Sequence, residues 1–388
     1  MRLPIYMDHH ATTPVDPQVL EVMLPFLKDD FGNASSRNHV FGWKAEEAVE
    51  ASRIAVAECI GGTSREIVFT SGATESNNLA LLGVAESYAA SGKHIITQAT
   101  EHKAILDTLA VLEKRGFEIT VLPVDEEGMI NPEEVRAAIR PDTILVSLML
   151  VNNEVGTVQP LEAVGALCRE AGVLLHCDAV QGVGKVPFDV EAMGVGLASL
   201  SAHKIYGPKG VGALYVSRRN PRVTLSPILF GGGHERGMRS GTLNVPGIAG
   251  LGEACRILTR GAGGENERIQ GLRDALWARI RQGLDGVTLN GHPTKRHPGN
   301  LHVSFQGVEA EALIMALRDV AVSSGAACTS ATLEPSHVMK ALKVPLERAH
   351  SSVRFGLGRF NTVEEVDFVG DLVVGQVDRL RELAKSQR

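Results

Sequence analysis

Short apolar runs alternate with longer amphipathic stretches through the first two thirds of this chain, and this rhythm constrains the fold most strongly. The spacing predicts strands at Ile67–Thr70, His94–Thr97, Ile119–Pro123, Ile144–Met149, Val173–Cys177, Leu197–Leu200 and Gly212–Val216. Helices are expected at 43–60, 74–91, 101–115, 132–140 and 160–171. Strands joined by helical crossovers pair in parallel, so we expect an α/β fold with a mainly parallel sheet and helices on both faces.

The pattern changes near residue 260, where GAGGENERIQ reads as a linker into a helix at 264–283. A strand at Asn300–Phe305 and helices at 309–318 and 363–386 are expected to follow. The small residues at 323–335 show no periodicity and predict a mobile loop. We therefore expect a large domain over 15–258 and a smaller α+β C-terminal domain over 259–388, joined by residues 1–14.

Composition excludes several classes of function. The 388 residues carry a net charge of −6 without a long basic run, so no direct contact with nucleic acid is expected. No apolar run is long enough for a bilayer, and the N-terminus lacks a signal-peptide core, so no membrane contact is expected. The five widely spaced cysteines suit neither a disulfide framework nor a zinc site and favour the cytoplasm.

Polar clusters stand at the ends of five predicted strands. They are Ser71–Thr74, Glu101-His102, Asn152–Glu154, Asp178 and Ser201–Lys204. Ligands of open α/β sheets bind beyond the carboxyl ends of the strands. These clusters together therefore predict one site at that edge of the sheet.

Two charged residues in these clusters have a chemical and a structural interpretation. A lysine directly after an apolar strand, such as Lys204, can be partly desolvated, which favours the neutral amine of a Schiff base; it can also be an ordinary solvated lysine. Asp178 can pair with a protonated pyridine nitrogen, cap a helix or form a structural ion pair. Gln181 can reach a ring hydroxyl, although it carries little signal by itself.

The strand-to-helix junction at Ser71–Thr74 offers backbone N–H groups to a phosphate, with Thr74 and Ser201 as hydroxyl donors. Plain helix capping is the alternative. No P-loop or Rossmann glycine pattern is found, which counts against a nucleotide. His102 can stack on an aromatic cofactor or move protons, or it can be a capping residue.

Cys328 differs from the other four cysteines because it lies among small polar residues in the aperiodic loop. A mobile, exposed thiol there can act as a nucleophile, whereas Cys59, Cys168, Cys177 and Cys255 fall in predicted helices and a strand, where burial is expected. Arg354 can bind a substrate carboxylate bidentately or form a structural salt bridge. No intrinsic metal site is expected.

The chain resembles the cysteine desulfurases of the NifS/IscS group, within the class V, fold-type I aminotransferases that use pyridoxal 5′-phosphate. The resemblance rests on motifs spread over nearly the whole sequence, among them DHHATTPVDP, EIVFTSGATESNNLA, HCDAVQGVGKVPFD, SAHKIYGPKGVGALYV, SSGAACTSATLEPSHV and HSSVRFGLGRF. It implies conversion of L-cysteine to L-alanine with the sulfur carried as a persulfide on Cys328.

The resemblance also implies a role for each matched residue. Lys204 would form the Schiff base, His102 would stack on the ring, Asp178 would pair with the ring nitrogen and Gln181 with the phenolic oxygen. The other cofactor positions would be Ala73, Thr74, Asn153, Ser201 and His203, with Thr242 from the second subunit of a homodimer. Asn33 and Arg354 would hold the substrate carboxylate.

Some implied properties concern partners. Sulfur would pass to an iron–sulfur scaffold protein and to other acceptors, including those of tRNA thiolation, and Cys328 would transiently ligate a cluster shared with the scaffold. Ala326 and Val180 replace a serine and a threonine usual in the family, and the chain stops at Arg388 without the longer tail of many members, which leaves the acceptor open. A selenocysteine lyase, a desulfinase, an ordinary aminotransferase and a non-catalytic sulfur-transfer scaffold remain the alternatives.

Overall fold

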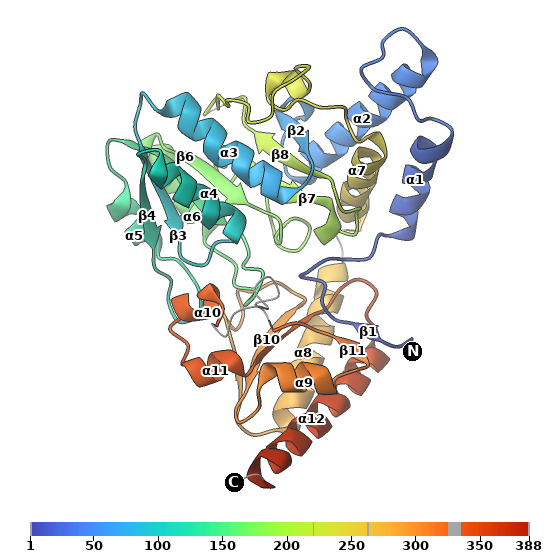
Figure 1. Cartoon of the computed structure of the whole chain (residues 1–388), viewed down its shortest axis with the longest axis vertical. Helices are drawn as coiled ribbons and strands as arrows, with labels where there is room; N and C mark the ends of the chain where they lie inside the picture. The colour runs from blue at the N-terminus through green and yellow to red at the C-terminus, as the bar shows by residue number, and fades with distance from the viewer. Residues whose placement is uncertain (1, 220, 262–263, 325–334, 387–388) are drawn as a thin grey trace.

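The computed structural model describes the chain except residues 1, 220, 262–263, 325–334 and 387–388. A seven-stranded sheet forms the centre of its larger part, in the order β2-β8-β7-β6-β5-β3-β4 (Figure 1). The strands are β2 (Ile67–Thr70), β3 (His94–Gln98), β4 (Glu118–Leu122), β5 (Thr143–Met149), β6 (Leu174–Asp178), β7 (Leu197–Ser201) and β8 (Gly212–Val216). All seven strands predicted for this part of the chain are therefore present.

Five of these strands, from β7 to β4, pair in parallel. Strand β8 runs antiparallel to both of its neighbours, β7 and β2. The expectation of a mainly parallel sheet is confirmed. The parallel pairing aligns the carboxyl ends of β5, β6 and β7 at one edge, where Asp178 pairs in register with Ser199.

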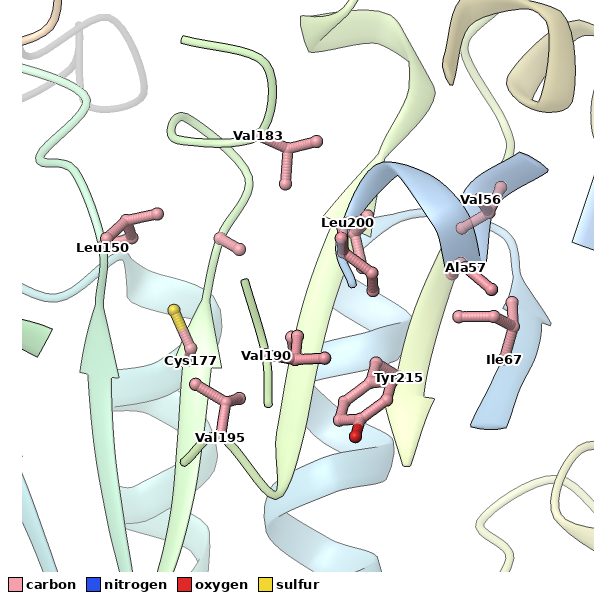
Figure 2. Packing of buried hydrophobic residues seen from close by; sticks show 14 of the residues in the cluster. Val56, Ala57, Ile67, Leu150, Cys177, Val183, Val190, Val195, Leu200 and Tyr215 are labelled. Atoms are coloured by element: carbon pink, nitrogen blue, oxygen red, sulfur yellow. The ribbon is translucent and has the colours of Figure 1, made fainter. Parts of the chain in front are cut away.

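Helices cover both faces of this sheet. They are α1 (Pro17–Lys28), α2 (Val40–Cys59), α3 (Ala73–Tyr88), α4 (Lys103–Lys114), α5 (Pro132–Ala138), α6 (Leu161–Ala171) and α7 (Val245–Arg260). Alternate strand residues supply the two cores: Leu175 and Cys177 of β6 face the core containing α2, α6 and α7, whereas Leu174 faces the core of α3 and α4. Figure 2 shows Cys177, Leu200 and Tyr215 of adjacent strands in the first core. Burial on both faces explains why the strands are almost continuously apolar.

The C-terminal part has a separate hydrophobic core around a three-stranded antiparallel sheet, β12-β10-β9. Its elements are α8 (Glu265–Gly283), β9 (Val287–Leu289), β10 (Asn300–Phe305), α9 (Ala310–Ala316), β11 (Val320–Ala321), α10 (His337–Ala341), α11 (Leu346–His350), β12 (Ser352–Gly356) and α12 (Val363–Ser386). The N-terminal strand β1 (Ile5–Tyr6) pairs with β11, so Ile5 and Met7 are buried in this core.

Several elements were not predicted from the sequence. Helix α1 has one buried residue, Val19, and exposes Leu20, Leu24 and Leu27, so its apolar spacing is weak as a core signal. Strand β12, which contains Arg354, lies in the small sheet and follows the five-residue helix α11. The apolar stretch around Arg354 is short and is interrupted by this charged residue, so the sequence shows no clear strand pattern at β12.

Candidate active site

Lys204 is the last residue of the short 3₁₀ helix η2 (Ala202–Lys204), which directly follows β7. Its Nζ donates to the backbone carbonyl of His10 and, at 2.9 Å, to that of Ala11. The carbonyl of His10 also accepts a hydrogen bond from Gln181 Nε2 at 2.9 Å. One backbone oxygen therefore brings together Lys204 and Gln181, which the sequence predicted for the same cofactor.

Asp178, the last residue of β6, is buried. Its Oδ2 accepts from Asn77 Nδ2 of α3 at 2.8 Å, and its Oδ1 accepts from the backbone N–H of Val180 at 3.1 Å. An ionised carboxylate offers about four acceptor positions, so Asp178 can accept a further donor. Sequence reasoning did not identify Asn77, which lies four residues after Ala73 on the helix that follows the SGAT junction.

The N-terminus of α3 forms the third part of the site. Gly72 is the N-cap residue and has no side chain to bond the N–H groups of Ala73 and Thr74. A Cβ added to Gly212, which pairs with Ser201 across β7 and β8, would lie 2.7 Å from Gly72 Cα. The close backbone approach therefore requires glycine, and it places Ser201 beside a helix terminus that can bind an anion.

His203 contacts the N-terminal segment of the chain, with Nδ1 lying 3.1 Å from Thr12 Oγ1. Burial, together with Lys204 and Lys209, lowers the pKa of His203 to about 4. The ring is therefore neutral at physiological pH and retains an N–H donor.

His102 is the exposed N-cap residue of α4, and its Nδ1 accepts from the backbone N–H of Ala104 at 3.1 Å. For His102 the sequence predicts either helix capping or a catalytic role, and this contact is such a cap. The preceding residue, Glu101, is buried, and burial together with nearby Asp178 raises the pKa of its carboxyl well above the ordinary value. Glu101 Oε1 accepts from the N–H of Met149 at 2.5 Å, which ties the β3–α4 connection to the end of β5.

Arg354 points from β12 to the larger part of the chain. Its Nη1 donates to the carbonyl of Asn153 at 2.7 Å and its Nη2 to Asp8 Oδ1 at 2.8 Å. The side chain is almost completely buried, and Nε has no partner among the described residues. The predicted carboxylate-binding arginine is thus also part of an ion pair with Asp8, which sequence reasoning did not identify.

Two other predicted residues are exposed, and a third lies outside the described residues. Asn33 is exposed, and its Oδ1 accepts from the N–H of Ser35 at 2.9 Å. Thr242 is exposed in the segment before α7. Cys328, together with most of the loop predicted at 323–335, lies outside the described residues.

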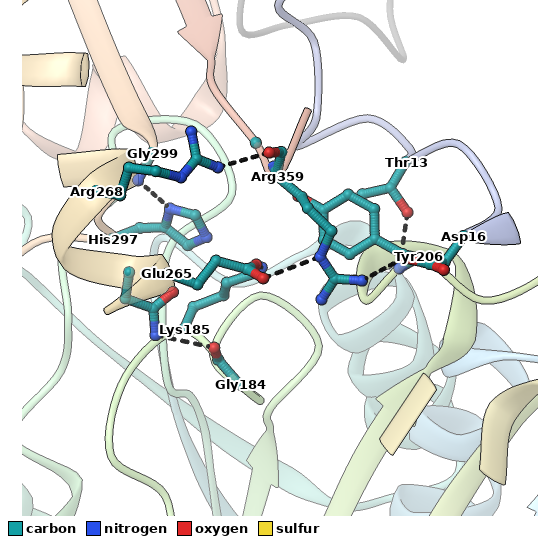
Figure 3. Close-up of polar contacts among 12 residues, drawn as sticks. Thr13, Asp16, Gly184, Lys185, Tyr206, Glu265, Arg268, His297, Gly299 and Arg359 are labelled. Carbon is teal, nitrogen blue, oxygen red and sulfur yellow. Dashed lines mark hydrogen bonds and ion pairs between the residues drawn. The ribbon is translucent and has the colours of Figure 1, made fainter. Parts of the chain in front are cut away.

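A network of polar contacts holds Tyr206, two residues after Lys204, against the C-terminal part of the chain (Figure 3). Tyr206 has a φ of 67°, and its Oη accepts from the N–H of Arg359 at 2.6 Å. The Arg359 guanidinium lies over the Tyr206 ring and bonds both Asp16 and Glu265. These contacts fix the backbone that follows Lys204.

Within the described part of the chain, no group of three His, Cys, Asp or Glu residues is arranged to hold a metal ion. The same residues include no helix that is long and apolar enough to cross a membrane.

The fold and the site define a class of protein. The family model described as aminotransferase class-V matches residues 5–369, and the chain belongs to this family. The family is dependent on pyridoxal phosphate. The residues present fit that cofactor: the buried carboxylate of Asp178 suits a ring N–H, the amine of Lys204 suits a carbonyl carbon, and the uncapped α3 terminus suits a phosphate.

Within the family, the chain is similar to proteins named cysteine desulfurase IscS. The one from Anaeromyxobacter sp. (strain Fw109-5) is 60% identical over 384 residues, which is 99% of this chain and 95% of the relative. That of Aeromonas hydrophila is 58% identical over 386 residues, with the same coverage. Among solved structures, a NifS-like protein has a TM-score of 0.89 at 37% identity, covering 99% of this chain and all of its own. A structure titled SspA in complex with cysteine has a TM-score of 0.82 at 36% identity, covering 92% and 100%.

Proposed function

We propose that this chain is a cysteine desulfurase that uses pyridoxal phosphate held on Lys204 to take sulfur from L-cysteine. It releases L-alanine and keeps the sulfur as a persulfide on Cys328. The observation that carries the proposal is the shared contact of Lys204 and Gln181 with the carbonyl of His10, next to buried Asp178. The similarity to proteins named cysteine desulfurase supports the substrate.

Each part of the cofactor has a set of residues in this proposal. Asp178 would keep the ring nitrogen protonated, Gln181 would donate to the phenolic oxygen, and His102 would stack on the ring. The N–H groups of Ala73 and Thr74 would bind the phosphate together with Ser201, His203 and the partner subunit's Thr242, and Asn153 would contact the ring. When bound, the cofactor supplies an electron sink for the bonds around the substrate α-carbon.

The substrate carboxylate is assigned to Arg354 and Asn33. The unpartnered Nε of Arg354 supports this assignment, because a buried N–H without a partner is costly and a carboxylate satisfies it with a charge-assisted hydrogen bond. With the cofactor bound, the Lys204 amine would take the substrate α-proton, and His102 would assist proton movement. A neutral His203 adds no positive charge beside that amine.

The sulfur step needs a second nucleophile. The Cys328 thiolate attacks the substrate sulfur, and an S–S bond forms as the bond between that sulfur and the substrate β-carbon breaks. The electron pair of the broken bond stays on the β-carbon side, which gains a proton to give L-alanine. Cys328 follows Ser323 by five residues in the sequence, and the backbone of Ser323 pairs with that of Arg354. The chain leading to the thiol therefore starts beside the residue assigned to the substrate carboxylate.

One assay tests this function. Purified protein given L-cysteine should yield L-alanine and an equal amount of sulfane sulfur on Cys328 in a single turnover without acceptor. Cys328→Ser should retain the visible absorbance of the cofactor and lose sulfur release, whereas Lys204→Ala should lose both the covalent link to the cofactor and turnover. A protein that forms no alanine from L-cysteine would exclude the desulfurase function.

The domain division at residues 258 and 259, with 1–14 joining the smaller domain, and the homodimer are part of this proposal. Exposed apolar residues support the dimer: Phe31 is 69% exposed and stacks on Phe41, and Phe230 is 84% exposed twelve residues before Thr242. Exposed apolar side chains that pack on one another, as Phe31 and Phe41 do, are typical of interaction surfaces. Mass measurement in solution tests the dimer, and mixing Thr242→Ala with Lys204→Ala subunits tests whether Thr242 completes the partner's site.

The acceptors are proposed to be an iron–sulfur scaffold protein and proteins of tRNA thiolation, in the cytoplasm. The four described cysteines are all unpaired, which agrees with a reducing compartment. Transfer of labelled sulfur from Cys328 to a purified scaffold protein, with and without iron, tests the acceptor and the transient ligation of a cluster by Cys328.

A further inference from the structure

His10 is buried between two residues of the proposed site. Its Nδ1 lies 3.2 Å from Gln181 Oε1, and its backbone carbonyl accepts from Gln181 Nε2 at 2.9 Å. The same carbonyl accepts from Lys204 Nζ. Both ends of the Gln181 amide are therefore bonded to one residue, whose side chain is 3% exposed.

The contacts fix the tautomer of His10. An amide oxygen only accepts, so the proton of the neutral ring is on Nδ1 and is donated to Gln181 Oε1. Burial lowers the pKa of His10 well below its ordinary value, so the ring stays neutral. Nε2 then has a lone pair and no partner among the described residues.

His297 holds the plane of this ring. The two imidazoles meet edge to face, with centroids 4.5 Å apart. His297 Nδ1 accepts from the N–H of Gly299 at 3.0 Å, which fixes His297 in turn. Packing therefore aims the Nδ1–H of His10 at one place, the oxygen end of the Gln181 amide.

We propose that His10 is a positioning residue that fixes which way the Gln181 amide faces, so that the second N–H of Gln181 Nε2 is available to the phenolic oxygen of the cofactor. The two ends of an amide have nearly the same shape, and a flipped amide would present its oxygen to the phenolic oxygen, where two acceptors repel. The backbone carbonyl of His10 opposes that flip because it would then face the amide oxygen, and the Nδ1–H of the His10 ring adds a donor that only the unflipped amide oxygen can accept. This inference rests on the proposed function, which assigns Gln181 to the cofactor.

The test is a pH titration of the visible absorbance of the holoenzyme without substrate. Its midpoint reports the proton affinity of the Lys204–cofactor linkage, which a hydrogen bond to the phenolic oxygen lowers. His10→Leu and His10→Phe should raise the midpoint by at least about 0.5 unit, a roughly threefold change in proton affinity. The phenylalanine variant keeps a ring against His297, so lost packing is separated from the lost donor.

Rescue and coupling variants sharpen the test. His10→Asn places an amide N–H near the position of Nδ1–H and should restore a midpoint close to that of the wild type. Gln181→Ala should raise the midpoint, and the double variant with His10→Phe should shift no further than Gln181→Ala alone, because both changes remove one interaction. His9→Phe is the matched control: His9 is the preceding residue, it is also buried, and its Nδ1 bonds the carbonyl of Gly356, so its variant should leave the midpoint unchanged.

The outcomes separate the inference from the function. A shift in Gln181→Ala without one in His10→Phe, or additive shifts in the double variant, would overturn the positioning role alone. No shift in Gln181→Ala would overturn the role of Gln181 together with that of His10. A purified protein without cofactor absorbance would overturn the proposed function itself.

Discussion

Arg354 donates to Asp8 at 2.8 Å while its Nε remains without a partner among the described residues. Asp8 precedes the His10 segment, and Arg354 belongs to the small antiparallel sheet, so the pair joins the N-terminal segment to the C-terminal part of the chain. Asp8 balances the buried guanidinium charge, and it leaves one edge of the arginine for a ligand.

We predict that Asp8→Asn lowers stability and strengthens the response to a carboxylate ligand. Removing one partner of a buried ion pair leaves an uncompensated charge and costs about 3 kcal/mol. A bound amino-acid carboxylate then restores part of that loss. The thermal midpoint should therefore fall in the variant and rise more on addition of L-alanine than it does in the wild type.

Asp16→Asn provides the control for this prediction. Asp16 accepts from Arg359 at 2.7 Å, an ion pair of similar burial that has no assigned role in substrate binding. Its variant should also lose stability, but without a larger response to L-alanine. Equal responses in the two variants would argue against the assignment of Arg354 to the carboxylate.

Glu154 gives a stability that depends on pH. Burial raises the pKa of its carboxyl to about 7, although Ser336 Oγ donates to Glu154 Oε2 at 2.5 Å. In the unfolded chain the carboxyl has an ordinary pKa near 4.5. Between these values the folded protein binds more protons, so the free energy of unfolding falls as pH rises from about 4.5 to 7, by up to about 3 kcal/mol.

Glu154→Gln should remove this fall, since the amide still accepts from Ser336 and does not ionise. Ser336→Ala removes a contact that lowers the Glu154 pKa, so the upper end of the pH window should move above 7. Denaturant unfolding of the three proteins between pH 4.5 and 8 measures both effects. The same pH slope in the wild type and in Glu154→Gln would assign the fall to other groups.

Lys185 has the opposite dependence. Its buried Nζ has no hydrogen-bond partner among the described residues and lies 3.9 Å from Glu265 and 4.9 Å from the Tyr206 ring. Burial lowers its pKa to about 8 from 10.5. Between these values the unfolded chain binds more protons, so the free energy of unfolding should rise with pH from about 8 to 10.5, by up to about 3 kcal/mol.

Lys185→Met should be at least as stable as the wild type at pH 7 and should lose that rise. Lys209→Met, at an exposed position in the same part of the chain, is the control and should keep it. The free energy of unfolding, measured for the three proteins at several pH values from 7 to 10, tests this prediction. A marked loss of stability in Lys185→Met at pH 7 would show that its weak contact with Glu265 outweighs the cost of burying the amine.

Arg53 and Glu235 form another buried ion pair, at 2.7 Å, which sequence reasoning did not identify. Glu235 also accepts from the N–H of Phe69 in β2, and it has a φ of 48°. Glu235→Gln should cost about 3 kcal/mol or more, because Arg53 keeps a buried charge. Glu50→Gln removes the exposed partner of the same arginine and should cost under about 1 kcal/mol in denaturant unfolding. Equal losses of unfolding free energy in the two variants would show that the buried pair stabilises the fold no more than the exposed pair does.

The seven strands of the large sheet, the positions of several site residues along the chain and the family could all be predicted from the amino-acid sequence. Periodicity is local: each apolar run between turn residues has its own length and burial pattern, so β2 to β8 were predictable one at a time. Lys204, Asp178 and the Gly72 junction were found because each follows such a run directly. The family followed from motifs that keep their spacing along the chain.

Contacts between residues that are far apart in the sequence could be seen only in the folded chain. The carbonyl of His10 meets Lys204 and Gln181 across more than 170 positions of sequence, and Asp8 meets Arg354 across 346. No local pattern encodes such pairs, because they arise only after the sheet has aligned its strand ends and β1 has paired with β11. The antiparallel direction of β8 and the buried charges of Lys185 and Glu154 depend on the same long-range packing.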